Sequence, residues 1–119
     1  MRANSFSTTQ ERTAVIAAGN SLSSGVKLGG MPLVGIEVDG DWAAAQVTFQ
    51  YSRDGGTTWF DVKDDGVEYV VAALTGPDAS AVDFRLFLGY DLIRVRSGTA
   101  GAPVAQAAGT TVTLLGRKM

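Results

Sequence analysis

Residues 45–62 read AQVTFQYSRDGGTTWFDV, and this stretch decides the fold class. Between residues 45 and 52 the odd-numbered side chains are apolar or aromatic and the even-numbered ones are polar. A period of two that includes β-branched and aromatic residues is typical of a half-buried β-strand. Asp54-Gly55-Gly56 is a turn sequence, and the short run TWFDV at residues 58–62 follows it closely. Strand, tight turn and strand predict a β-hairpin.

Similar short apolar runs, separated by turn residues, lie on both sides of this hairpin at spacings of roughly ten residues. The further strands that we expect cover residues 13–18, 22–28, 32–39, 67–73, 91–97 and 110–116. Residues 79–88 fit a strand, a loop or one helical turn. No helical period is long enough for the crossover helices of a parallel sheet.

The sequence therefore predicts an all-β protein, a single antiparallel β-sandwich (jelly-roll-like) of about eight short strands. We expect residues 13–119 to form one sandwich domain. The polar residues 1–12, MRANSFSTTQER, are expected to form a flexible N-terminal arm. A neighbouring molecule could order such an arm on docking.

Composition narrows the classes of function. The 119 residues are 45% hydrophobic and 18% charged, which is a globular rather than a disordered balance. The ten Lys and Arg residues are scattered and the net charge is −2, so no basic tract tracks a phosphate backbone. No apolar run approaches the roughly 18 residues of a membrane-spanning helix. The amino terminus also lacks the apolar stretch of a secretory signal. We expect neither nucleic acid nor membrane as a partner.

The chain contains no cysteine and no histidine. These absences exclude a disulfide framework, thiolate chemistry, histidine-assisted nucleophiles and metal sites that rely on imidazole. A pair of carboxylates remains the one common catalytic device available. We therefore expect no cofactor, no metal and no enzymatic activity.

Ser52, Asp54, Gly56, Thr58 and Trp59 occupy all five fixed positions of the Asp-box pattern Ser-x-Asp-x-Gly-x-Thr-Trp. In this pattern the Asp accepts hydrogen bonds from the turn backbone, the Gly supplies positive φ, and the Trp packs beneath the turn. In sialidases and related propellers the motif repeats on several blades, away from the catalytic site. It occurs once here, in a chain too short for a propeller. We expect it to build a rigid hairpin.

Acidic residues form two clusters in the sequence. They are Asp61, Asp64, Asp65 and Glu68, and Glu37, Asp39 and Asp41. Two carboxylates about 5–10 Å apart can hydrolyse glycosides, and oxygen-rich loops can hold Ca²⁺. Asp at hairpin ends also caps turns and keeps a domain soluble. The last interpretation is favoured, because Asp64-Asp65-Gly66 lacks the ligand spacing of an EF-hand.

Six larger aromatic residues are candidates for the sugar-stacking platform that carbohydrate-binding sandwiches use. They are Trp42, Tyr51, Trp59, Phe60, Tyr69 and Tyr90. Tyr51 falls on the apolar face of its strand, and the hairpin accounts for Trp59. Trp42, after the turn Asp39-Gly40-Asp41, is the residue that we expect to be exposed and able to stack on a sugar. Packing in the core or under a turn is the alternative for all six.

Arg85, Arg94 and Arg96 are candidates for an interface with a neighbouring subunit. Arg94 and Arg96 share one strand face by the two-residue period. Arginine is enriched at interfaces because its planar guanidinium binds carboxylates in a bidentate manner. A solvated face with cross-strand pairs to Asp or Glu explains the same pattern. The sequence leaves both interpretations open.

The chain resembles small proteins encoded among the structural genes of tailed bacteriophages, and proteins of the phage-derived gene transfer agents of alphaproteobacteria. The resemblance covers about residues 15–116. Its elements are GMPLVGI at 30–36, WAAA at 42–45, DGGTTW at 54–59 and RVRSG at 94–98. None of these segments is a catalytic signature.

The resemblance implies a component of a phage-like virion, assembled in the bacterial cytoplasm. The expected role is a head-spike base, or a fibre-anchoring or decoration subunit, with capsid or other virion proteins and a fibre or spike protein as partners. A homo-oligomer joined through sheet edges and the N-terminal arm is expected. Three alternatives stay open: a carbohydrate-binding module that recognises host surface polysaccharide, a tail accessory protein, and a small carboxylate glycosidase.

Overall fold

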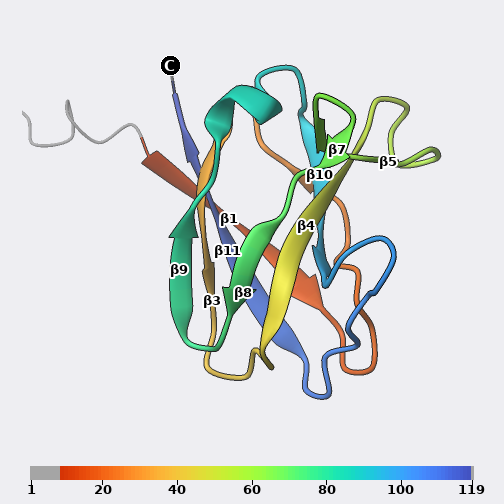
Figure 1. The fold of residues 1–119 in the computed structure, drawn as a ribbon. Coiled ribbons are helices and arrows are strands. Elements are labelled where there is room, and N and C mark those ends of the chain that lie inside the picture. The colour runs from red at the N-terminus through yellow and green to blue at the C-terminus, as the bar shows by residue number, and fades with distance from the viewer. Residues whose placement is uncertain (1–8, 119) are drawn as a thin grey trace, which may run out of the picture.

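The computed structural model describes residues 9–118, which form an all-β domain of two facing antiparallel sheets (Figure 1). The strands are β1 (Thr9–Ile16), β2 (Val26–Lys27), β3 (Leu33–Val38), β4 (Ala45–Ser52), β5 (Phe60–Asp61), β6 (Lys63–Asp64), β7 (Val67–Glu68), β8 (Val71–Leu74), β9 (Asp78–Ala81), β10 (Leu92–Ser97) and β11 (Thr110–Arg117). One 3-10 turn, η2 (Phe84–Phe87), precedes β10. No helix in the described residues is long and apolar enough to cross a membrane.

The strand pairing is that of a jelly roll. One sheet has the order β1-β11-β3-β9, and the other has the order β2-β10-β4, with β5 and β8 both pairing with β4. Without the two-residue strands β5, β6 and β7, eight strands remain. In chain order, the first of these pairs with the eighth (β1 with β11) and the second with the seventh (β2 with β10). The third pairs with the sixth (β3 with β9), and the fourth with the fifth (β4 with β8). This is one long hairpin rolled into two layers.

The predicted fold class is confirmed, but the number of strands differs. Residues 9–118 form eleven strands rather than about eight. Two of the additional strands lie in the connection between β4 and β8: β6 lies between the predicted runs 58–62 and 67–73, and the run 67–73 is divided into β7 and β8. The third is β9, most of which falls in the segment 79–88 that the sequence left open.

The core lies between the two sheets, where alternate residues of each strand point inward. Its fully buried members include Ile16, Leu33, Ile36, Val47, Phe49, Ile93, Val95, Val112 and Leu114. Phe49 packs edge-to-face on Phe87 of η2, with ring centroids 5.3 Å apart. The apolar residues of the period of two in 45–52 and 91–97 therefore face the core, as expected, whereas Thr48 and Arg96 on the opposite face are buried as well.

The N-terminal boundary differs from the expected one. Residues Thr9–Arg12 belong to β1 and pair with β11, so the part of the expected arm over 9–12 is ordered strand. The remainder of that arm, residues 1–8, lies outside the described residues. The ambiguous segment 79–88 divides between the last residues of β9 and the turn η2.

Candidate functional site

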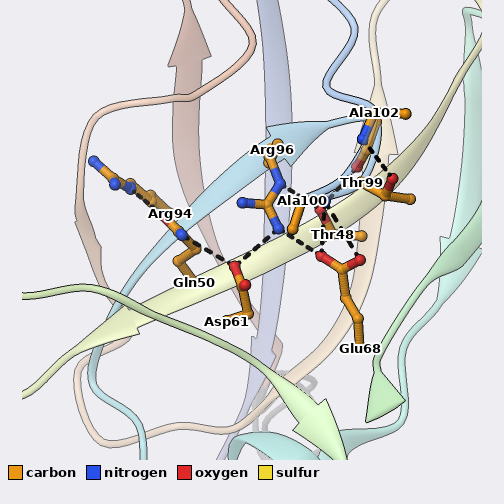
Figure 2. Close-up of polar contacts among 10 residues, drawn as sticks. Thr48, Gln50, Asp61, Glu68, Arg94, Arg96, Thr99, Ala100 and Ala102 are labelled. Carbon is orange, nitrogen blue, oxygen red and sulfur yellow. Dashed lines mark hydrogen bonds and ion pairs between the residues drawn. The ribbon is translucent and has the colours of Figure 1, made fainter.

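A buried arginine holds the connection between β4 and β8 onto the outer face of the β4–β10 sheet (Figure 2). The side chain of Arg96 is 7% exposed, and its Nη2 lies 2.9 Å from Asp61 Oδ1 on β5. The same nitrogen donates to Glu68 Oε2 on β7, and Arg96 Nε donates to Thr48 Oγ1 at 3.0 Å. One guanidinium thus joins four strands: β4, β5, β7 and β10.

Gln50 extends this polar cluster toward Arg94. Its Nε2 donates to Asp61 Oδ1 at 3.0 Å, and its Oε1 accepts from Arg94 Nε at 2.8 Å. Strand register produces the arrangement, because Arg96 lies opposite Thr48 and Arg94 opposite Gln50. Residues opposite each other in an antiparallel pair share a face. The Glu68 carboxylate also accepts from the Ala100 backbone N–H, which ties the loop after β10 to β7 (Figure 2).

The surroundings of Asp61 and Arg94 in this cluster shift the pKa values of both groups. Burial alone would raise the pKa of Asp61, but hydrogen bonds from Gln50 and Arg96 outweigh it and hold the pKa below its ordinary value. Burial lowers the pKa of Arg94, and the nearby charge of Arg96 lowers it further. A glycosidase acid needs a raised pKa, whereas Asp61 is shifted in the opposite direction. In this arrangement Asp61 and Glu68 neutralise the charge of Arg96.

A shallow open groove of about 420 Å³ lies beside this cluster, at the end of the sheet. Its lining combines four aromatic and three polar side chains from β4, β5, β6 and the segments next to β5 and η2. They are Tyr51, Trp59, Phe60 and Tyr90, with Gln50, Asp61 and Lys63. Residues about 40 positions apart meet here because β4 and the segment after η2 lie at the same end of the jelly roll.

The aromatic rings of the groove are packed against one another. Tyr51 and Tyr90 stack with centroids 3.7 Å apart and planes 10° apart, and burial followed by contact with Tyr51 raises the pKa of Tyr90. Phe60 packs on Tyr51 at 5.9 Å, yet 55% of Phe60 stays exposed. Arg94 Cζ lies 4.3 Å from the centre of the Trp59 ring, in cation–π geometry. The groove thus offers one exposed ring on a rigid aromatic support.

The Asp-box hairpin forms one end of this groove. Asp54 Oδ1 accepts from the backbone N–H groups of Thr57 at 3.1 Å and Thr58 at 2.8 Å. Ser52 Oγ accepts from the Gly56 N–H, and Trp59 Nε1 donates to the Gly56 carbonyl oxygen at 2.9 Å. Gly56 has a φ of +100°, which glycine adopts without strain. Hydrogen bonds from the Thr58 backbone, the Thr58 side chain and Ser52 lower the pKa of Asp54 to about 2.

The structure contradicts the expected sugar-stacking role of Trp42. This residue is 2% exposed and belongs to the core, so it presents no ring face to a ligand. Its backbone N–H donates to the Asp39 carbonyl oxygen, and its backbone carbonyl oxygen accepts from the Gly76 N–H. The turn before Trp42 folds the indole inward instead of leaving it at the surface. The rings that do reach the surface groove are those of residues 51, 59, 60 and 90.

The three arginines do not form one interface. Arg94 and Arg96 share the outer face of β10, as the period predicts, but Arg96 is buried and ion-paired within the chain. The prediction that Arg96 contacts a neighbouring subunit is therefore wrong, because its guanidinium is bound within the chain. Arg85 lies apart on η2, 73% exposed, and forms an ion pair with Asp83 two residues away. Arg94 covers the Trp59 ring.

The acidic residues of the two clusters have different structural roles. Asp39 accepts from Thr110 Oγ1 and from the Thr111 N–H; burial opposes this, but those bonds hold its pKa below the ordinary value. Asp65 lies in the turn between β6 and β7 with a φ of +51°. No group of three acidic residues in the described part of the chain is arranged to hold a metal ion.

Sequence reasoning did not single out Gln106, one of several buried polar residues. Gln106 is fully buried; its Nε2 donates to the Ala43 carbonyl oxygen at 3.1 Å and to Ser97 Oγ at 2.8 Å, and its Oε1 accepts from the Ala43 N–H. It lies in a run of small residues that carries no periodic signal. An isolated polar residue between alanines was the only indication available.

No known family model matches this chain, and a search of curated proteins finds no match in sequence.

Proposed function

We propose that this protein is a non-enzymatic structural subunit on the surface of a phage-like virion, assembled in the bacterial cytoplasm. Its role would be that of a head-spike base, or a fibre-anchoring or decoration subunit, and it would work as a homo-oligomer. The resemblance over residues 15–116 supports the class, and jelly rolls are common in viral capsid proteins. Fold alone does not carry a function, but a feature of the surface also supports this role.

That feature is the free edge of β1. β1 has eight residues and pairs with β11 without a bulge, while its other edge has no backbone partner among the described residues. The other edge strands, β2, β5, β8 and β9, have four residues or fewer. Proteins usually keep edge strands short, bulged or charged, because a long free edge pairs with other chains. Residues 13–16 of β1 carry no charge and no proline.

Particles with and without this protein test the proposal. Electron microscopy of particles from a strain that lacks the gene should show loss of density on the head surface, and complementation should restore it. Purified protein should bind the depleted particles. Loss of tail density instead would support the tail accessory alternative. Intact particles with no bound copies of this protein would contradict the proposal.

The aromatic groove supports a second candidate function, recognition of host surface polysaccharide. A concave site lined by aromatic rings with a few polar groups is typical of small-ligand sites, and lectins also use the jelly roll. Phe60 would stack on the apolar face of a sugar ring, while Lys63 would bind hydroxyl groups at the rim. This candidate is compatible with a virion location.

Intrinsic fluorescence tests the second candidate, because Trp59 lines the groove and Trp42 is buried elsewhere. In a Trp42→Phe background, titration with capsular polysaccharide from the host should change the Trp59 emission in a saturable way. Phe60→Ala should weaken binding at least roughly tenfold, about 1.4 kcal/mol. Phe84→Ala, an exposed phenylalanine outside the groove, is the matched control. Equal binding by both variants would contradict a sugar site at Phe60.

A further inference from the structure

The free edge of β1 is complementary to itself in one register. We propose that two copies of this chain pair antiparallel through β1 about a two-fold axis at Thr13, so that their β1–β11–β3–β9 sheets become one continuous sheet. The partner of the free β1 edge is thus a second copy of this chain, an inference that rests on the proposed virion function. A two-fold pair uses the same surface on both copies, so the sequence of β1 alone determines which residues face each other.

The first constraint comes from the two faces of the sheet. Ala14 and Ile16 point into the core, whereas Thr13 and Val15 face solvent. In a continuous sheet, residues directly opposite each other share a face. An outward residue must therefore lie opposite an outward residue of the second copy. This leaves only registers in which one residue of β1 faces its own symmetry mate.

The second constraint comes from charge. A pair centred on Arg12 places two guanidinium groups opposite each other, and one centred on Glu11 does the same with two carboxylates. Like charges directly opposite are destabilising. A pair centred on Ala14 or Val15 avoids this but joins only residues 12–16 or 14–16. The centre at Thr13 joins residues 10–16 of each copy, which is the longest pairing without opposed like charges.

The pairs in that register are individually compatible. Thr13 faces Thr13 of the second copy, and threonine pairs are favourable across strands. Arg12 lies opposite Ala14, and Glu11 lies opposite Val15, so each charge meets a small or apolar neighbour. Val15, 51% exposed in the single chain, would gain a partner. Two-residue β2 is the neighbouring edge of the other sheet, so it presents no long strand that competes for the second copy.

Engineered cysteines test the register, because the natural chain contains none. Thr13→Cys places two thiols directly opposite, at the Cα separation of about 4.5–5.5 Å that a disulfide spans. Val15→Cys is the matched control on the same face and strand. Its two copies would lie about 13 Å apart along the sheet, beyond the roughly 7 Å limit for a disulfide. Both sites are exposed, so folding should be unaffected.

In oxidised glutathione, Thr13→Cys should give a covalent dimer, seen on non-reducing gels, at least roughly tenfold faster than Val15→Cys. A mixture of Glu11→Cys and Val15→Cys should give the mixed dimer in preference to either homodimer. Equal rates for both single variants, or no covalent dimer, would overturn the inference. If the β1 dimer is overturned but wild-type protein still binds the depleted particles, the proposed virion role is retained. If wild-type protein also fails to bind them, both the dimer and the virion role are contradicted.

Discussion

Arg96 and Asp54 show how single residues gain their properties from neighbours. Arg96 is buried only because Asp61 and Glu68 neutralise it, which meets the condition for burying a charge. Asp54 is exposed, yet the ends of its own turn supply its hydrogen-bond donors. In the first case the partners come from distant strands, and in the second they come from the adjacent residues.

Replacing Arg96 by methionine should reduce the free energy of unfolding by about 2–4 kcal/mol, because two partly buried carboxylates lose their shared counter-charge. Urea unfolding followed by circular dichroism measures the change. Arg85→Met is the control, since Arg85 and Asp83 form an exposed ion pair, and exposed ion pairs contribute little to stability. An equal decrease in the free energy of unfolding of the two variants would show that the Arg96 cluster stabilises the fold no more than an exposed ion pair does.

Asp54 should make stability depend on pH in the acid range. Its pKa of about 2 in the folded chain lies below the ordinary value of 3.8. The ionised form therefore stabilises the folded state above about pH 4, and this contribution is lost as the pH falls from about 4 to 2. The stability advantage of the wild type over Asp54→Asn should shrink between pH 5 and pH 2.5, as measured by urea midpoints. A constant difference would contradict the assignment.

At the scale of elements, the connection between β4 and β8 departs most from a simple jelly roll. It contains the Asp-box hairpin and the short pairs β4–β5 and β6–β7. Strands of two residues contribute few ladder hydrogen bonds, so the conformation of this connection depends on turn geometry and on the contacts to Arg96. The aromatic groove lies against this same connection.

Gly56→Ala should destabilise the protein by about 1 kcal/mol or slightly more, because an alanine at a φ of +100° is strained. The added Cβ would lie 3.6 Å from Trp59, an ordinary contact, so backbone strain is the expected cause. Gly40→Ala is the matched control, since it has no positive φ and open space around it; it should be neutral or slightly stabilising. Thermal unfolding distinguishes the two.

At the scale of the whole molecule, the jelly roll brings together segments that are far apart in the chain. β1 and β11, the first and last strands, pair over eight residues. Gln106 joins the loop before β11 to residue 43, two residues before β4, and to residue 97, at the end of β10. These contacts close the end of the sandwich opposite the aromatic groove.

Gln106→Ala should lower the free energy of unfolding by about 2–4 kcal/mol, because it leaves the buried Ser97 hydroxyl and the part-buried Ala43 backbone groups without their partner and opens a cavity. The midpoint of thermal unfolding should fall by roughly 6–24 °C, because a domain of this size loses about 3–6 °C per kcal/mol. Gln46→Ala, an exposed glutamine on β4, is the control and should change stability by less than about 0.5 kcal/mol. Similar changes in both variants would contradict a closing role for Gln106.

The sequence by itself determined the fold class, the hairpin at residues 52–59 and the inward faces of β4 and β10. These follow from period-two alternation and from turn residues, which act over a few neighbouring positions. The tertiary structure decided which residues meet across the sheets. It buried Trp42, enclosed Arg96 between two carboxylates and gathered residues 51, 60 and 90 into one groove. Local patterns carry no information on these contacts, because strand order and register bring together residues that are tens of positions apart in the chain.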